Sequence, residues 1–482
     1  MRLAVSLLLA AACSQTEARP DSRIALSPCR IKGSGLQAQC GSLRVPEDRA
    51  APSGRQIDLH VAIVPALARA PAADALFLLA GGPGQGASEA MGVLLGAFER
   101  IHRTRDLVLV DQRGTGLSHA LRCDLHDAGA TLAERLSGDA ALSEQRFRKC
   151  LQGYDADPRL YTTSIAMQDL DDVRAALGYE RIDLWGGSYG TRAALTYLRE
   201  HGGHVRAVVL DGVAPREQVL PVTFARDAQR SMDLLLDNCA SDAACAKAFP
   251  GLRARFEKLL ADLGRAPAHA TVQDPLTGAP AEVSIGRDVF ASGLRGVLYQ
   301  QDLASLVPLI VDRAARGDFA PFVASTAGLD SGYSRTMSFG LTFSVLCAED
   351  LPFTSRAEIV ERSKGTFLGA HDALAFADIC SFWPRGAPPD RSPVKSDKPV
   401  LLLSGEIDPA TPPQWAEIAR RTLPNSLHLV VPGVGHGASA EGCVPQLMAK
   451  FVETADVKAV DAKCLQPLQR PPFFVSFAGP MP

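Results

Sequence analysis

The sequence predicts an α/β fold: a mostly parallel central sheet with helices on both faces and an inserted, mainly helical cap. One reason is that short, mainly apolar runs, typical of strands covered on both faces, alternate with helical patterns. These runs lie at 75–79, 106–110, 182–185, 205–210 and 400–403. A second is a serine between glycines where one run meets a helical pattern, at 186–190. A third is the long helix-rich stretch before the last strands.

The charge balance of the chain limits the kinds of partner and substrate that we expect. The chain has 482 residues, with 50 Lys and Arg against 53 Asp and Glu and no block of like charge. We therefore expect no nucleic-acid partner, and a neutral or small polar substrate. We divide the chain into an export signal (1–13), a first core part (14–215), the cap (216–395) and a second core part (396–482). Nothing in the sequence calls for a cofactor, and the oligomeric state stays open.

The N-terminus is typical of an exported protein. Arg2 precedes the apolar run 3–12, which is too short to span a bilayer, and Cys13 follows. Ala-Ala-Cys after leucines resembles a bacterial lipoprotein signal with Cys13 as the lipidated residue, although Ala10 stands where such signals usually carry Leu. Simple cleavage after the alanines is the alternative. We expect a periplasmic, membrane-anchored or secreted protein.

The cysteines agree with export. Without Cys13 the chain has ten, an even number as a set of disulfides requires. Our hypothesis is sequential pairing, namely Cys29 with Cys40, Cys123 with Cys150, Cys239 with Cys245, Cys347 with Cys380, and Cys443 with Cys464. Buried free thiols in a cytosolic enzyme are the alternative. No pair has zinc-ligand spacing with histidines nearby, so we expect no metal site.

The core elements follow in order. Residues 37–46 and 56–64 predict an antiparallel hairpin, because apolar and polar residues alternate in the second segment. The apolar runs are then joined by helical patterns, and the second core part repeats the rhythm. The expected helices are 88–101, 164–177, 189–200 and 413–421, and the expected last strand is 427–431. Within the cap we expect helices at 224–239, 252–263, 289–298 and 303–316, with a small hairpin around 273–280.

Ser188 is the expected nucleophile. Residues 186–190 fit the G-x-S-x-G pattern, in which a tight strand-to-helix turn exposes the serine. The alternative is an ordinary serine in a glycine-rich loop, but the strand before it and the helix after it favour a nucleophile. Chemistries that place a carboxylate at this position, as in dehalogenases and epoxide hydrolases, are excluded.

The loop Gly81-Gly82-Pro83-Gly84 follows a buried strand and predicts part of an oxyanion hole. Acyl transfer creates an oxyanion that needs two backbone N–H donors, and glycine lets the backbone approach the substrate. We expect one donor from Tyr189, just after the serine, and the other from Gly81 or Gly82. A plain turn is the alternative for this loop.

Asp408 and His436 are expected to complete a triad. Each lies in a loop just past a late strand, which gives the chain order Ser, Asp, His typical of this type of nucleophile. His436 would be the general base, and the acid would hold its imidazole in the right tautomer. Glu406 competes with Asp408, and we favour Asp408 because it lies deeper in the loop.

Together these motifs resemble the α/β-hydrolases of the proline iminopeptidase and tripeptidyl aminopeptidase group, including a TAP-like C-terminal region. The matching segments are 81–84, 111–114, 186–190, 398–412 and 435–437. The resemblance implies an aminopeptidase with Ser188, Asp408 and His436 as its triad. Proline iminopeptidases carry His before Gly-Gly-Pro-Gly, where this chain has Ala80, so the tripeptidyl branch is the closer likeness.

An aminopeptidase must also bind a substrate ammonium, which calls for carboxylates in a desolvated pocket. Glu349 and Asp350, late in the cap, are the candidates, and a solvated acidic turn is the alternative. A carboxylesterase acting on small acyl esters fits the same triad, because specificity lies in the cap. A catalytically silent binding protein is disfavoured, since all three triad positions are filled.

Overall fold

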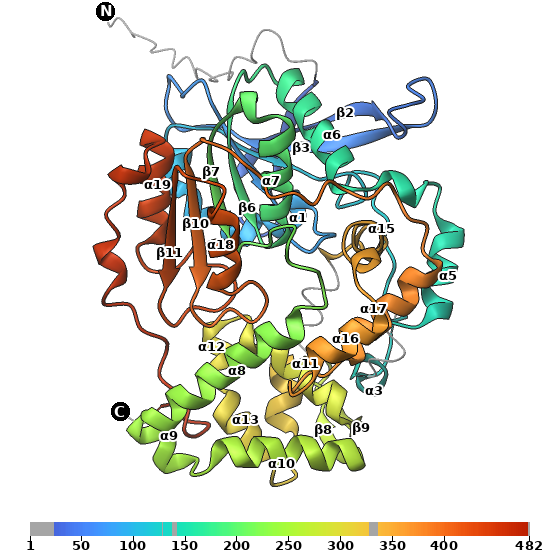
Figure 1. Ribbon diagram of the computed structural model, residues 1–482, viewed down its shortest axis with the longest axis vertical. Helices are drawn as coiled ribbons and strands as arrows, with labels where there is room; N and C mark the ends of the chain where they lie inside the picture. Colours follow the sequence, from blue (N-terminus) through green and yellow to red (C-terminus); the bar gives the residue numbers. More distant parts are fainter. Residues whose placement is uncertain (1–23, 128, 137–141, 327–335, 481–482) are drawn as a thin grey trace, which may run out of the picture.

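The computed structural model describes residues 24–127, 129–136, 142–326 and 336–480 (Figure 1). Within them nine strands form one sheet. In sheet order they are β1 (Ser27–Arg30), β2 (Gln37–Pro46), β3 (Gln56–Val64), β5 (Leu107–Val110), β4 (Leu76–Leu79), β6 (Ile182–Gly187), β7 (Val205–Asp211), β10 (Val400–Gly405) and β11 (Ser426–Val431). The six strands from β5 to β11 run parallel, whereas β1, β2 and β3 pair antiparallel at one side. The expected export signal (1–13), which includes Cys13, lies outside the described residues.

Helices cover both faces of this sheet, because its central strands are apolar on both sides. On one face, α6 (Thr163–Ala176), α7 (Tyr189–Glu200) and α18 (Pro413–Arg420) bury their apolar residues against the strands. On the other face lie α1 (Ala87–Ala90), the 3-10 helix η1 (Gly92–Phe98), α2 (Glu99–His102) and α19 (Val444–Thr454). The molecule thus has the α/β-hydrolase fold expected from the sequence.

Two helices expected as single elements are divided. The segment 88–101 is divided into α1, η1 and α2. The division falls near Gly92, whose backbone packs so closely against Lys32 that a Cβ at Gly92 would overlap the Lys32 carbonyl oxygen. The segment 303–316 divides into α12 (Gln301–Ala304) and α13 (Val307–Ala314), with Pro308 in the first turn of α13. In both places a tertiary approach or a proline overrides a helical pattern.

The larger part of the cap follows β7, and its first layer forms the lower part of Figure 1. Its first layer packs around its own apolar cluster. Its elements are α8 (Phe224–Ser241), α9 (Ala243–Ala248), α10 (Leu252–Arg265), the hairpin of β8 (Ala268–Gln273) and β9 (Pro280–Ile285), α11 (Arg287–Leu298), α12 and α13. The chain returns to this layer at its end, since Phe473 packs in the same cluster and Phe474 N–H donates to the Ser305 carbonyl.

A second layer of the cap includes a segment that the sequence analysis assigned to the core. Helices α15 (Phe339–Glu349), α16 (Arg356–Ser363) and α17 (His371–Phe382) pack with α5 (Glu144–Gly153), which precedes the nucleophile in the chain. Helix α3 (Leu132–Leu136) likewise packs against β9. The cap is therefore built from two insertions, one on each side of β6 and α7. The remaining short 3-10 helices are Pro158–Leu160, Gly202–His204, Leu351–Phe353, Val457–Ala459 and Ala462–Leu465.

Five disulfides link the ten cysteines of the described chain, in the sequential pairs that we hypothesised. Cys347–Cys380 joins α15 to α17, and Cys123–Cys150 ties the loop after β5 to α5. Two of the five thus fasten the second layer of the cap. Across the described residues, none of the helices has the length and apolar character needed to cross a bilayer.

Candidate active site

Ser188 lies at a sharp turn between β6 and α7. Its backbone has φ 55° and ψ −124°, a conformation that is rare for a residue with a side chain and costs free energy. The flanking glycines make the turn possible, because a Cβ at Gly186 would overlap the carbonyl of Gly190, and one at Gly190 would overlap that of Leu79. This is the strained geometry of a nucleophile elbow.

The glycine loop after β4 stands beside the serine. A Cβ placed on Gly81 would lie only 3.1 Å from the Ser188 Cβ, so bare backbone approaches the nucleophile there. Gly82 has φ +109°, which favours glycine. Tyr189 is the first residue of α7, and its N–H therefore has no helical acceptor. Gly81 and Tyr189, the residues expected to supply the oxyanion donors, thus both lie next to Ser188.

Asp408 and His436 are joined directly. The Nδ1 of His436 lies 2.8 Å from Asp408 Oδ2, and the aspartate side chain is fully buried. Glu406, the competing acid, points elsewhere and accepts the backbone N–H of Gly433 at 2.8 Å. The acid partner of the imidazole is therefore Asp408.

Thr411 is a member of this site to which the sequence analysis assigned no role. Its hydroxyl donates to Asp408 Oδ2 at 2.7 Å and lies 3.1 Å from His436 Nδ1. The backbone N–H groups of Ala410 and Thr411 donate to Asp408 Oδ1 at 2.7 and 2.8 Å. The signal in the sequence is Asp-x-x-Thr, in which the Asp side chain caps the turn that follows it. These donors orient the carboxylate toward the imidazole.

The backbone of Asp211 and Gly212 contacts both Ser188 and the imidazole of His436. Ser188 N–H donates to the Asp211 carbonyl at 2.8 Å, and a Cβ on the next residue, Gly212, would lie 3.3 Å from His436 Cε1. The imidazole therefore lies over the peptide next to the serine. Among the described residues Ser188 Oγ makes no hydrogen bond to His436, and such bonds commonly tighten only when substrate binds.

The Asp211 side chain anchors the loop that carries His436. Its carboxylate accepts the N–H groups of Ala438 at 2.8 Å and Ser439 at 2.8 Å. Burial raises the pKa of Asp211, and these bonds oppose the rise. The residues that anchor the loop lie within three positions of His436, so they fix its backbone.

The charges around His436 favour its protonated form. Burial, the largest single effect, lowers the pKa of His436, but the charge and the hydrogen bond of Asp408 act against it, and the net result is a pKa above its usual value. Asp211 adds to this rise, and the guanidinium of Arg295 opposes it. The pKa of Asp408 is lowered, because the nearby imidazole and the backbone donors outweigh the effect of burial. An imidazole paired in this way can take a proton from a hydroxyl.

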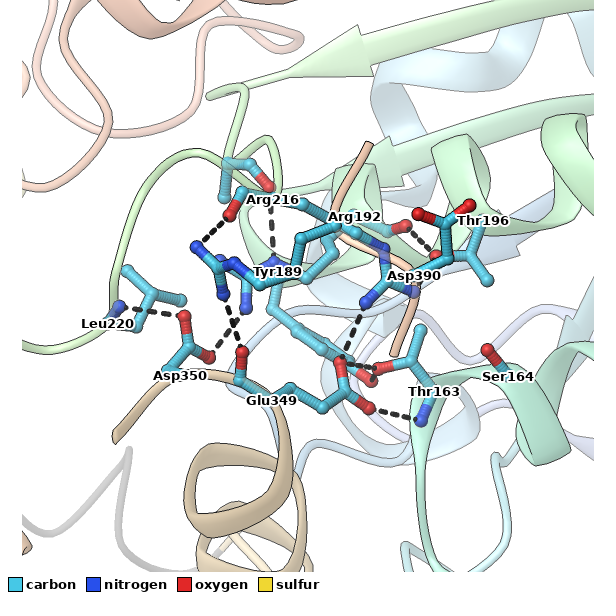
Figure 2. Close-up of polar contacts among 12 residues, drawn as sticks. Thr163, Ser164, Tyr189, Arg192, Thr196, Arg216, Leu220, Glu349, Asp350 and Asp390 are labelled. Atoms are coloured by element: carbon cyan, nitrogen blue, oxygen red, sulfur yellow. Dashed lines mark hydrogen bonds and ion pairs between the residues drawn. The ribbon is translucent and has the colours of Figure 1, made fainter. Parts of the chain in front are cut away.

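Glu349 and Asp350, which we expected to bind a substrate amine, lie in a buried ion cluster (Figure 2). Asp350 Oδ2 accepts from Arg192 Nη1 at 2.6 Å. Glu349 accepts from the N–H and hydroxyl of Thr163 at 2.7 and 2.9 Å, and it lies 3.4 Å from Arg216 Nη1. Both carboxylate side chains are at most 1% exposed. Arginines neutralise both carboxylates and solvent does not reach them, so both are engaged within the protein, and their amine-binding role stays a prediction.

The same cluster reaches the nucleophile helix. The hydroxyl of Tyr189 is 2.7 Å from Thr163 Oγ1, which in turn donates to Glu349 (Figure 2). Arg192, one turn further along α7, is held by Asp350. The cluster therefore fixes the start of α7, including the residue whose N–H is the expected oxyanion donor.

One group of residues in the described chain has an arrangement compatible with a metal ion: Asp171, His201 and His204. It lies at the far end of α7 from Ser188, about 18 Å away at 1.5 Å per residue. Asp171 is already bonded to Arg174 at 2.7 Å and to the Tyr197 hydroxyl at 2.7 Å. These contacts neutralise the aspartate, and the distance separates the group from chemistry at Ser188.

One family model and several known proteins match this chain. Residues 366–464, from the end of the cap through β10, β11 and α19, match the family described as TAP-like protein. Serine protease Hip1 of Mycobacterium tuberculosis is 27% identical over 91% of this chain and 90% of its own length. Carboxylesterase B of the same organism is 28% identical over 89% and 86%. Tripeptidyl aminopeptidase of Streptomyces coelicolor is 24% identical over 88% and 83%.

The fold, the strained serine between β6 and α7 and these similarities lead to one conclusion. The chain is a serine hydrolase of the α/β-hydrolase fold and carries a TAP-like C-terminal region.

Proposed function

We propose that the protein is an exported serine aminopeptidase that releases N-terminal residues, proline or short peptides, from peptide substrates. The observation that carries the proposal is the meeting of a strained serine, an imidazole and a buried carboxylate, contributed by the ends of three strands. Relatives named serine protease and tripeptidyl aminopeptidase, matched along most of this chain, support peptides as the substrate class.

In this proposal Ser188 is the nucleophile and His436 its general base. The imidazole removes the hydroxyl proton as Oγ attacks the peptide carbonyl, and Asp408 stabilises the resulting imidazolium. His436 then donates that proton to the leaving amine, which departs and leaves an acyl-enzyme. Water, deprotonated by the same imidazole, hydrolyses the acyl-enzyme and restores the serine.

Two backbone donors would stabilise the oxyanion of each tetrahedral intermediate. We assign them to Tyr189 N–H and to an N–H of the Gly81-Gly82 segment, because both stand beside Ser188. They are fixed before substrate arrives, Tyr189 by the cluster of Figure 2 and Gly81 by its packing on the serine. Donors fixed in this way lower the barrier without reorganising during the reaction, an effect of roughly 100-fold or more per donor.

A carboxylesterase activity on small acyl esters is the second candidate. It is favoured by one observation, that Glu349 and Asp350, the carboxylates expected to bind a substrate ammonium, are paired with arginines. A relative named carboxylesterase B supports it.

A substrate panel decides between the two. Proline and tripeptide anilides, each with a free and a blocked amino group, are compared with short-chain nitrophenyl esters by kcat/KM. The aminopeptidase proposal predicts that the free-amine anilides are cleaved and that blocking the amine abolishes cleavage. Rapid ester hydrolysis with no cleavage of any anilide would instead assign the protein to the esterases.

Export is part of the proposal. The five disulfides support it, since such bonds persist in oxidising compartments. We further propose Cys13 as a lipidation site that anchors the protein to a membrane. Mass spectrometry of the mature N-terminus tests this, with a lipid-modified Cys13 as the expected result and an unmodified residue beyond it as the contrary one.

A further inference from the structure

Arg295 lies beside His436 and has no part in the mechanism described so far. It belongs to the last turn of α11, with its guanidinium carbon 4.2 Å from the ring centre of Phe224 and 5.1 Å from that of Tyr299. The rings of Tyr299 and His436 are 4.9 Å apart, and the Tyr299 carbonyl accepts the His436 N–H at 2.8 Å. The guanidinium is thus held between aromatic rings at the edge of the candidate site.

This guanidinium has no acidic partner among the described residues. Its Nη2 donates to the Tyr299 hydroxyl at 2.5 Å, and its buried Nε has no hydrogen-bond partner. Other cap arginines differ, since Arg255, Arg287 and Arg313 each pair with an aspartate. A planar guanidinium offers five N–H donors in a fork that fits a carboxylate, and most of those of Arg295 are unused.

The position of Arg295 indicates that its guanidinium faces the leaving group of the substrate. The leaving nitrogen must come within hydrogen-bond reach of the imidazole that protonates it, so the leaving group lies on the histidine side. Because Arg295 and His436 both contact Tyr299, the guanidinium lies within about ten ångströms of the imidazole, a span that one to three residues cover at roughly 3.3–3.6 Å each.

We propose that Arg295 binds a carboxylate on the leaving group, so that the enzyme favours short peptides whose released part carries a free C-terminus or an acidic side chain. The inference rests on the proposed function, because it takes His436 as the group that protonates the leaving amine. In addition, the enzyme recognises the leaving group of the substrate, and Arg295 acts as a specificity-determining residue for it.

Matched substrate pairs test the proposal. Pro-Ala and Ala-Pro-Ala-Ala are compared with their C-terminal amides, and Ala-Pro-Ala-Asp amide separates an acidic side chain from a free C-terminus. 4-Acetoxybenzoate and 4-acetoxybenzamide form an ester pair that differs in the same way. We measure kcat/KM on the alkaline plateau of activity, so that a changed pKa of His436 does not enter the comparison.

We expect the wild type to favour each carboxylate over its amide by about tenfold or more. Arg295→Met should reduce that ratio to within about twofold while changing amide cleavage little, and Arg295→Lys should keep part of it. Arg316→Met, in an exposed cap arginine, is the control and should leave the ratio unchanged.

Equal losses on both members of each pair in Arg295→Met, or an unchanged ratio, would overturn the proposal. If peptides are not cleaved at all, the aminopeptidase function fails. The ester pair then still decides, since a carboxylate preference lost in Arg295→Met supports the role of Arg295 and its absence refutes it.

Discussion

The hydroxyl of Thr411 contacts both polar partners of the candidate triad, and its loss should weaken catalysis. Thr411→Val removes the donor to Asp408 while keeping the shape of the side chain, and a lost bond to a buried carboxylate leaves that carboxylate less well oriented. We expect kcat/KM to fall about tenfold or more, with Thr411→Ser within about threefold of wild type. Steady-state kinetics with matched thermal melts measures this, and an undiminished kcat/KM in Thr411→Val would contradict the assignment.

The charges around His436 predict how activity depends on pH. The imidazole must be neutral to accept a proton, so kcat/KM should rise with pH through the pKa of His436. Asp408 and Asp211 raise that pKa despite burial, so the midpoint should lie above about 6.5.

Asp211→Asn tests the sign of this effect. It removes one charge that stabilises the imidazolium but keeps an oxygen acceptor for the N–H groups of Ala438 and Ser439. The midpoint should move to lower pH. Asp155→Asn, at an exposed carboxylate, serves as control, and a midpoint that rises in Asp211→Asn would refute our electrostatic account.

At the scale of elements, the buried pair of Arg192 and Asp350 connects the nucleophile helix α7 to the residue that follows α15 of the cap. Both side chains are at most 1% exposed. Arg192→Met leaves a buried carboxylate without its cation, which we expect to lower the free energy of unfolding by about 3–5 kcal/mol.

The double variant Arg192→Met/Asp350→Leu should recover much of this loss, because it removes both buried charges together. Urea unfolding of the two variants measures the difference. Arg253→Met, in an exposed pair with Asp233, should cost less than about 1 kcal/mol. A double variant less stable than Arg192→Met would show that the pair is not what joins these helices.

The sequence predicted individual elements best where one pattern decides them. Helix α7 and strands β2 and β3 have the predicted bounds, because strand alternation and the glycine-flanked turn are local signals. Helix α15 was not predicted, since it is buried all round and shows no amphipathic period. The single helix expected at 88–101 was wrong, because the contact of Gly92 with Lys32 cannot be read from local sequence.

The residues of the site also differ in whether local sequence could predict them. The serine, the glycine loop and the histidine each follow a strand, so the sequence could predict that strand ends bring them together. Thr411 could have been found from the local Asp-x-x-Thr pattern. The role proposed for Arg295, by contrast, depends on which side chains meet across the cap, and so does the pairing of Glu349 and Asp350 with arginines. Their partners, Arg216 and Arg192, lie more than a hundred residues away in the chain.

At the scale of the whole molecule, disulfides hold the cap together. Cys347–Cys380 closes a loop of 33 residues between α15 and α17. Replacing both cysteines with alanine should lower the free energy of unfolding by about 3–4 kcal/mol, chiefly by freeing the unfolded chain. Denaturant unfolding with and without reductant measures this, and a wild type whose stability is indifferent to reductant would contradict it.

The proposed catalysis requires Ser188 to be the nucleophile of a serine hydrolase. Labelling with a fluorophosphonate, followed by peptide mapping, tests that most directly. We predict a single modified serine, Ser188, with labelling abolished in Ser188→Ala and strongly reduced in His436→Ala. A label on another residue, or turnover that survives in a folded Ser188→Ala protein, would contradict the central claim.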